Sequence, residues 1–164
     1  MWRLGDVPFG FHTDEGHNAL DALRIAAGWR PAFLPGNNGR EPLFIYLMAA
    51  CLGVLGSSIW AARLAGVMSG VLLIPAQYVL VRSLPLPRAG RTAVVAAALA
   101  ATTFWPVAQA RYALRAGLLP LWVTLMLWAW WRAVDRGSNR HAVVAGVMLA
   151  LAVHTHLTGR LLPF

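Results

Sequence analysis

The chain contains no lysine, a single cysteine and only six acidic residues among its 164 positions. Charged residues make up 12% of the sequence, whereas soluble domains carry roughly 25%. The single Cys51 excludes a disulfide framework and a cysteine-based metal cluster. No apolar stretch follows Met1, because Trp2, Arg3 and Asp6 come first, so we expect no signal peptide. These absences argue against a soluble or disulfide-bonded domain.

Apolar residues take the place of the missing charges. They form 59% of the sequence, and the mean hydropathy is +0.59. A soluble core of this length could not bury so much apolar surface, whereas lipid could. The net charge of +8 does not indicate nucleic acid, because all fourteen basic residues are arginines, mostly at the ends of apolar runs, where they anchor helices. Membrane lipid is the expected partner, and the Ala- and Arg-rich composition is typical of a GC-rich bacterial genome.

Five apolar runs predict the fold class, an all-α polytopic membrane protein. A transmembrane helix needs about 20 residues, within a range of roughly 17–25. The second and third runs meet that length alone, and the fourth does so if a flanking arginine extends to the membrane surface. We therefore expect about four transmembrane helices. The runs cover 43–56, 64–81, 92–110, 117–131 and 142–153, the last continuing with interruptions to 164.

The arginines predict the orientation in the membrane. Connectors 82–91 and 132–141 each hold three arginines, with Asp135 as their one acidic residue. The positive-inside rule makes both cytoplasmic. Two runs separate them, so the short connectors 57–63 and 111–116 lie outside.

The side on which the acidic N-terminal segment lies depends on the run 43–56. If this run spanned the membrane, residues 1–42 would be cytoplasmic. Fourteen apolar residues are more often interfacial than spanning, and we favour an interfacial segment with 1–42 outside. The chain is thus divided into 1–63, an external loop with amphipathic and interfacial helices, and 64–164, the transmembrane helices.

Two adjacent carboxylates, Asp14 and Glu15, open an amphipathic helix predicted over 14–27, with Thr13 or Asp14 as its N-cap. A helix N-terminus favours an ionised carboxylate, which can serve as a general base. Simple helix capping is the alternative. Together with His12 and His17 these carboxylates could form a metal site, but the spacing matches no zinc pattern, so we expect no metal.

Three further candidates lie at predicted membrane edges. Glu41 precedes Pro42 and an apolar run, although a helix start with Arg40–Glu41 as a solvated pair would also explain it. Arg111 and Arg115, four apart, are predicted to share one helical face, where guanidinium groups bind phosphate or act as anchors. The polar stretch 154–160 ends in Arg160, and polar residues in an apolar run usually face a functional cavity. All of these residues fall on the predicted external side, which suits transfer from a lipid-linked phosphate.

Taken in order, these motifs resemble a known family. They are Asp14-Glu15, Glu41-Pro42, the aromatic-A-A-R-L stretch Trp60–Leu64, Gln109-Ala110-Arg111 and the region of Arg160. The order resembles the dolichyl- or polyprenyl-phosphate-sugar-dependent glycosyltransferases of the C-type membrane fold. The nearest groups are glycosyltransferase family 39, the protein O-mannosyltransferases and the aminoarabinose lipid A transferases.

The resemblance implies an enzyme that moves a sugar from a polyprenyl-phosphate donor to a protein, lipid or glycan acceptor, at the external or periplasmic face of the plasma (inner) membrane. Asp14 would activate the acceptor, and Glu15 and Glu41 would orient the acceptor or bind near the sugar. Arg111 would contact the donor phosphate with help from Arg115, and the Arg160 region would add to substrate binding. No resident cofactor is implied, since the lipid-linked sugar is a substrate, and no divalent metal is indicated.

Two departures from the family pattern matter. Several relatives carry an Asp shortly after the Arg of the motif that is Gln109-Ala110-Arg111 here, where this chain has Ala113, Leu114 and Arg115, and this argues against lipid A transferase activity specifically. The family also has a span before the acidic loop and many more spans after it, so we expect this chain to be part of a larger protein and inactive alone. The rival function is a transporter or channel subunit, which explains the spans but not the acidic external loop.

Overall fold

The computed structural model describes residues 3–37 and 39–162, and helices are the regular elements of this part of the chain. Its β-structure is limited to one isolated bridge between Leu34 and Arg40. The predicted all-α class is confirmed. The helices are α1 (Thr13–Ala26), α2 (Leu43–Leu55), α3 (Ile59–Ser83), α4 (Ala89–Thr102), α5 (Phe104–Arg111), the 3₁₀-helix η1 (Arg115–Leu118), α6 (Leu119–Arg136), α7 (Asn139–Val153) and the 3₁₀-helix η2 (Leu157–Leu161).

Two helical segments are long and apolar enough to cross a bilayer, Ile59–Ser83 and Arg115–Arg136. α4 and α5 make a third span if this bent pair is taken as one. α2 and α7 are apolar but shorter, with 13 and 15 residues. The described residues thus hold two or three segments of spanning length instead of the predicted four or so, because the run 92–110 is broken and the run 142–153 is short.

The break between α4 and α5 lies at Thr103 and has a local cause. Pro106 has no N–H to donate to the carbonyl of Thr102, and its ring would clash with that group. The hydroxyl groups of Thr102 and Thr103 donate back to the carbonyls of residues 98 and 99, at 2.8 and 2.6 Å, which also bends helices. The two helices meet at 53°, and α5 then packs against α3.

α3 and the segment that includes α5 approach closely at two glycines of α3. A Cβ atom on Gly66 would lie 2.5 Å from the carbonyl oxygen of Tyr112, and one on Gly70 would lie 2.3 Å from the Cβ of Ala110. Small residues four apart are typical of membrane helices that pack closely. The contact holds the connector between α5 and η1 against α3, at the end of the molecule where α1 lies.

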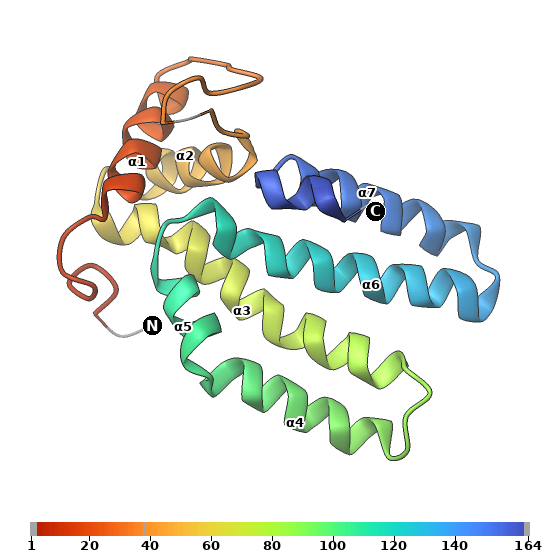
Figure 1. The fold of residues 1–164 in the computed structure, drawn as a ribbon. Helices are drawn as coiled ribbons and strands as arrows, with labels where there is room; N and C mark the ends of the chain where they lie inside the picture. The colour runs from red at the N-terminus through yellow and green to blue at the C-terminus, as the bar shows by residue number, and fades with distance from the viewer. Residues whose placement is uncertain (1–2, 38, 163–164) are drawn as a thin grey trace.

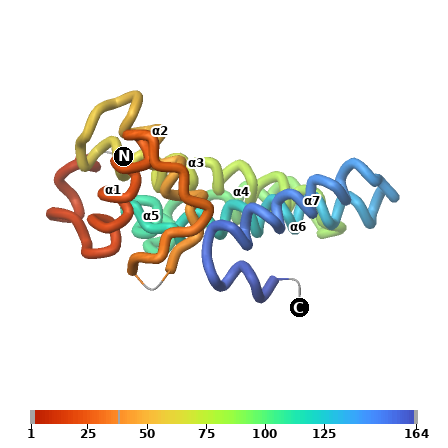
Figure 2. The backbone as a smooth tube through the Cα atoms, turned by 90° about the horizontal axis from the view of Figure 1, so that it is seen from above, coloured from red at the N-terminus to blue at the C-terminus, as the bar shows by residue number. Residues whose placement is uncertain are grey.

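The two ends of the molecule differ in character. The α3–α4 and α6–α7 turns, which carry the arginine-rich connectors, lie at one end, while α1, α2, the α5–η1 connector and η2 lie at the other (Figures 1 and 2). The relative placement predicted from the arginines is thereby confirmed. The main cluster of buried apolar side chains joins α1, α2, α3 and the start of α6, while α4 and α7 expose valines and leucines, as helices facing lipid do.

The segment that was predicted to be interfacial forms α2, which packs on α1 and α3. Its 13 residues make a helix about 20 Å long, less than the bilayer's hydrocarbon thickness of about 30 Å. Length therefore favours an interfacial segment, whose position in a membrane stays a prediction.

Candidate functional site

The first turn of α1 carries the two predicted catalytic carboxylates and places them in different surroundings. His12 is the N-cap: its Nδ1 accepts the N–H of Asp14 at 3.3 Å, and Glu15 Oε2 accepts the N–H of His12 at 3.0 Å. The predicted N-cap, Thr13 or Asp14, is wrong, because the imidazole supplies the capping acceptor and Glu15 completes a capping box. The Asp14 carboxylate therefore has other partners: it accepts from Asn37 Nδ2 at 2.8 Å, and its side chain is 51% exposed.

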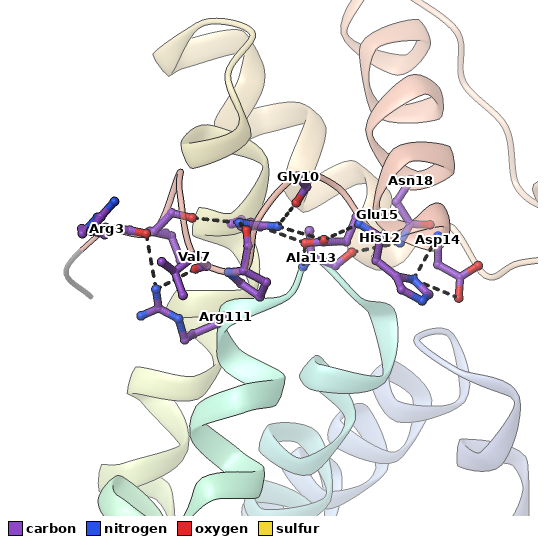
Figure 3. A network of polar contacts seen from close by, with 12 residues as sticks. Arg3, Val7, Gly10, His12, Asp14, Glu15, Asn18, Arg111 and Ala113 are labelled. Atoms are coloured by element: carbon purple, nitrogen blue, oxygen red, sulfur yellow. Dashed lines mark hydrogen bonds and ion pairs between the residues drawn. The ribbon is translucent and has the colours of Figure 1, made fainter.

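Glu15 is fully buried in an ion pair with Arg63, and Figure 3 shows the surrounding network. Arg63 donates to both carboxylate oxygens, from Nε at 3.0 Å and from Nη2 at 3.1 Å. The backbone N–H groups of His12 and Ala113 donate to the same oxygens, at 3.0 and 2.8 Å. Burial raises the pKa of Glu15, but these hydrogen bonds outweigh it, and the pKa lies below its usual value. Four donors saturate the carboxylate, so the contacts of Glu15 favour a structural role over contact with a substrate.

Two arginines fix the segment 3–10 that leads into α1. The remaining N–H groups of Arg63 donate at 2.5–3.1 Å to the carbonyls of Leu4, Pro8 and Gly10. Arg111, at the end of α5, donates through Nη2 to the carbonyls of Arg3 and Val7, at 3.4 and 2.6 Å (Figure 3). The proposed contact of Arg111 with a donor phosphate stays a prediction, and these bonds give it a different partner.

A third arginine, Arg40, joins α1 to the loop before α2. It is 2% exposed, forms an ion pair with Asp21 and donates to Asn18 Oδ1 at 2.7 Å. Asn18 in turn donates to the carbonyl of Ala113 at 3.0 Å. The interpretation of Arg40 and Glu41 as a solvated pair is wrong, because both are buried, with Glu41 only 6% exposed.

Glu41 stands just before α2, and its carboxylate joins two arginines from distant parts of the chain. Oε2 accepts from Arg115 Nη1 at 3.0 Å, and Oε1 accepts from Arg160 Nη2 at 2.9 Å. The Arg115 side chain is 17% exposed and that of Arg160 is 54% exposed. Three residues predicted separately as substrate-binding are thus brought together.

The predicted common helical face of Arg111 and Arg115 is wrong. α5 ends at Arg111, and Tyr112 and Leu114 are extended, so the two arginines lie on different helices. Their guanidinium groups have different partners: Arg111 contacts the segment 3–10 and Arg115 contacts Glu41.

A cavity of about 350 Å³ lies between α1, the loop before α2, η1 and the start of η2, and three of the six candidate residues line it: Asp14, Glu41 and Arg115. Arg160 adjoins this cavity through its bond to Glu41. The cavity lining includes the half-exposed carboxylate of Asp14, the guanidinium group of Arg115 and the imidazole of His156. Its lining residues are Asp14, Asn18, Asn37, Gly39, Arg40, Glu41, Leu114, Arg115, Ala116, His156 and Leu157.

His156 is a cavity residue that was absent from the predicted site, although the polar stretch 154–160 pointed to its surroundings. Its Nδ1 accepts the N–H of Thr158 at 3.3 Å, so the proton of the neutral ring is assigned to Nε2. Burial lowers the pKa of His156, Arg115 lowers it further, and Glu41 opposes them. The pKa of His156 therefore lies below its usual value.

Among residues 3–37 and 39–162, no three or more His, Cys, Asp or Glu side chains gather in a way that could hold a metal ion. The possible ligands named from the sequence have other surroundings, and Asp14 accepts from Asn37. His12 caps α1 and Glu15 pairs with Arg63, while His17 is exposed.

Comparisons with known proteins find one family model, described as dolichyl-phosphate-mannose-protein mannosyltransferase, which matches residues 38–164. Two similar proteins, from Pseudomonas aeruginosa and Pseudomonas paraeruginosa, are each named undecaprenyl phosphate-alpha-4-amino-4-deoxy-L-arabinose arabinosyl transferase. Each is 33% identical to this chain over 134 residues, which are 80% of this chain and 24% of the relative. The chain thus spans about a quarter of the length of these relatives. No solved structure matches.

These findings confirm the resemblance drawn from the motifs. The matched region includes Glu41, Gln109–Arg111 and Arg160 and begins after Asp14-Glu15. The family and the relatives are named as transferases, so the comparisons lend no support to a transporter or channel.

Proposed function

The chain belongs to the dolichyl-phosphate-mannose-protein mannosyltransferase family, and we propose that the whole protein is a membrane glycosyltransferase that uses a polyprenyl-phosphate-linked sugar. The observation that carries the proposal is the cavity in which the Asp14 carboxylate and the Arg115 guanidinium both lie, next to the Glu41–Arg160 pair. One group can take a proton from an acceptor, and the other can bind phosphate. The arabinosyl transferase relatives, named for an undecaprenyl phosphate-linked sugar, support a donor of this class.

In the proposed reaction Asp14 takes the proton from a hydroxyl or amine of the acceptor. The acceptor's lone pair attacks the anomeric carbon of the sugar, and the bond from that carbon to the phosphate oxygen breaks. The lipid phosphate leaves with the electron pair, and attack from the opposite face inverts the anomeric centre. Arg115 stabilises the charge that develops on the departing phosphate. Asn37 orients the Asp14 carboxylate through its 2.8 Å hydrogen bond.

We place the cavity at the external face of the plasma (inner) membrane. The arginine-rich connectors 82–91 and 132–141 lie at the opposite end of the molecule (Figure 1), and such connectors remain cytoplasmic. The donor would then present its phosphate at the outer membrane surface. The acceptor is a protein, lipid or glycan on that side.

The test replaces Asp14 with asparagine in the full-length protein and measures sugar transfer from a polyprenyl-phosphate donor in membranes. Since a general base typically contributes about 10²–10⁴-fold, we expect transfer to fall by that factor while expression and membrane insertion stay unchanged. Asp135→Asn is the matched control, because Asp135 is exposed at the opposite end of the molecule. Turnover near the wild-type rate in Asp14→Asn would remove Asp14 from this role.

A further inference from the structure

We propose that Glu41 is a positioning residue, which holds Arg115 and Arg160 together as one two-guanidinium site for the phosphate of the donor. This inference rests on the proposed function, because it assigns the donor's phosphate to this site. It differs from the expectation that Glu41 binds the acceptor or sugar directly.

The first argument is the geometry of the three side chains. Arg115 and Arg160 belong to η1 and η2, and they meet only through the two oxygens of one carboxylate, at 3.0 and 2.9 Å. Two guanidinium cations that bind the same carboxylate repel each other, most strongly where water is excluded. Arg115 is largely buried and Glu41 more so, so the carboxylate is what keeps the two cations side by side.

The second argument is the number of donors that remain. A guanidinium group has five N–H donors, and the contact with Glu41 engages one nitrogen, Nη1, of Arg115 and one nitrogen, Nη2, of Arg160. Each arginine therefore keeps N–H groups for another oxyanion. Phosphate oxygens match such fork-shaped donors, whereas Glu41 has both oxygens occupied and little exposed surface.

The third argument is the charge. Two guanidinium groups and one carboxylate leave one positive charge, which complements the single negative charge of a phosphodiester such as a lipid-phosphate-sugar. After transfer the lipid phosphate is a monoester, whose second ionisation brings its charge toward −2 near neutral pH. The site would thus bind the phosphate more strongly as the sugar leaves, the condition for stabilising a leaving group.

The experiment measures binding of a short-chain polyprenyl phosphate, the product, to the full-length protein in nanodiscs, so that no turnover is needed. Glu41→Gln keeps the side-chain shape and removes the charge. We expect it to weaken binding by about 10- to 100-fold, the range for a lost charged hydrogen-bond partner. Asp135→Asn is the control and should bind as the wild type does.

A double-mutant cycle separates positioning from direct contact. If Glu41 acts through the arginines, Glu41→Gln should have little further effect once Arg115 and Arg160 are both replaced by glutamine. If the two effects multiply instead, Glu41 contacts the ligand itself and the inference is wrong. Equal binding by Glu41→Gln would also overturn the inference, because the phosphate would then not need Glu41. Tighter binding would overturn it as well, because Glu41 would then compete with the phosphate for the arginines.

Glu41→Asp covers the case in which the glutamine variant does not insert. It keeps the charge, but its shorter side chain cannot reach both arginines, so binding should weaken by a smaller factor, and wild-type affinity would overturn the inference. The transfer assay distinguishes the two proposals. Binding that depends on Glu41 without any transfer would reject only the proposed function, and transfer with binding independent of Glu41 would reject only this inference.

Discussion

Replacing Glu15 with glutamine tests whether the buried ion pair with Arg63 holds the α1 end of the fold together. Both side chains are fully buried, and Arg63 would keep its charge after the change. Removing one partner of a buried pair costs about 3–5 kcal/mol. Glutamine also retains a single acceptor oxygen where four N–H groups now converge on two. This loss is a large fraction of the about 5–15 kcal/mol by which a whole domain is stable. We therefore expect the segment 3–30, which the ion pair holds in place, to open locally.

The assay is hydrogen exchange of the full-length protein in nanodiscs, followed over 3–30 and, as an internal reference, over α6. Exchange in 3–30 should speed up by about 10²–10³-fold or more, because each 1.4 kcal/mol is a factor of ten, while α6 stays protected. Asp6→Asn is the matched control: it breaks the exposed pair with Arg3, and such pairs contribute about 0–1 kcal/mol. Unchanged protection of 3–30 in Glu15→Gln would refute the reasoning.

The pH dependence gives the same prediction an independent check. The pKa of Glu15 is lowered in the folded state, so its stabilising contribution is complete above the unfolded carboxyl pKa of about 4.3 and is lost as the pH falls through the folded value. Protection of 3–30 should therefore be flat around neutral pH and fall on acidification. In Glu15→Gln this acid-dependent loss should be smaller, since the titrating group is absent.

Two further predictions concern orientation and packing. A cysteine at Asn37 should react with a membrane-impermeant thiol reagent added from outside, whereas one at Pro87 should react only after the membrane is opened; reaction at Pro87 from outside would reverse the orientation. Gly66→Ala should lower the unfolding temperature, because its Cβ would lie 2.5 Å from a backbone carbonyl oxygen and overpacking costs about 1–3 kcal/mol. Gly53→Ala, which meets nothing within 4 Å, is the control, and equal unfolding temperatures would contradict the close contact.

Signals that lie within short stretches of sequence predicted the class and the relative placement of the segments. The arginines of 82–91 and 132–141 were enough to put those connectors at one end, because charge near a membrane acts locally. The close approach at Gly66 and Gly70 also has a local signal, a pair of small residues four apart.

Contacts between distant residues could not be predicted in this way. Which of two adjacent acids faces the cavity depends on Arg63, 48 residues after Glu15. The burial of Glu41 depends on Arg115 and Arg160, which are 74 and 119 residues further along. The expected pairing of Arg111 with Arg115 failed for a local reason, since it assumed one helix where the backbone is extended after Arg111.

The partners of the acidic residues set Asp14 apart from the other carboxylates of the N-terminal segment, which supports the proton-accepting role that we propose for it. Of the five acids in the described part of residues 3–42, four are paired with arginine; the pairs are Asp6–Arg3, Glu15–Arg63, Asp21–Arg40 and Glu41–Arg115. A carboxylate that is already bound by a guanidinium group has fewer free oxygen lone pairs for the hydroxyl or amine of an acceptor. Asp14 instead accepts from the neutral amide of Asn37 and borders the cavity. Four of these five acids thus bind arginines, and Asp14 is the cavity carboxylate to which we assign the exchange of a proton with the acceptor.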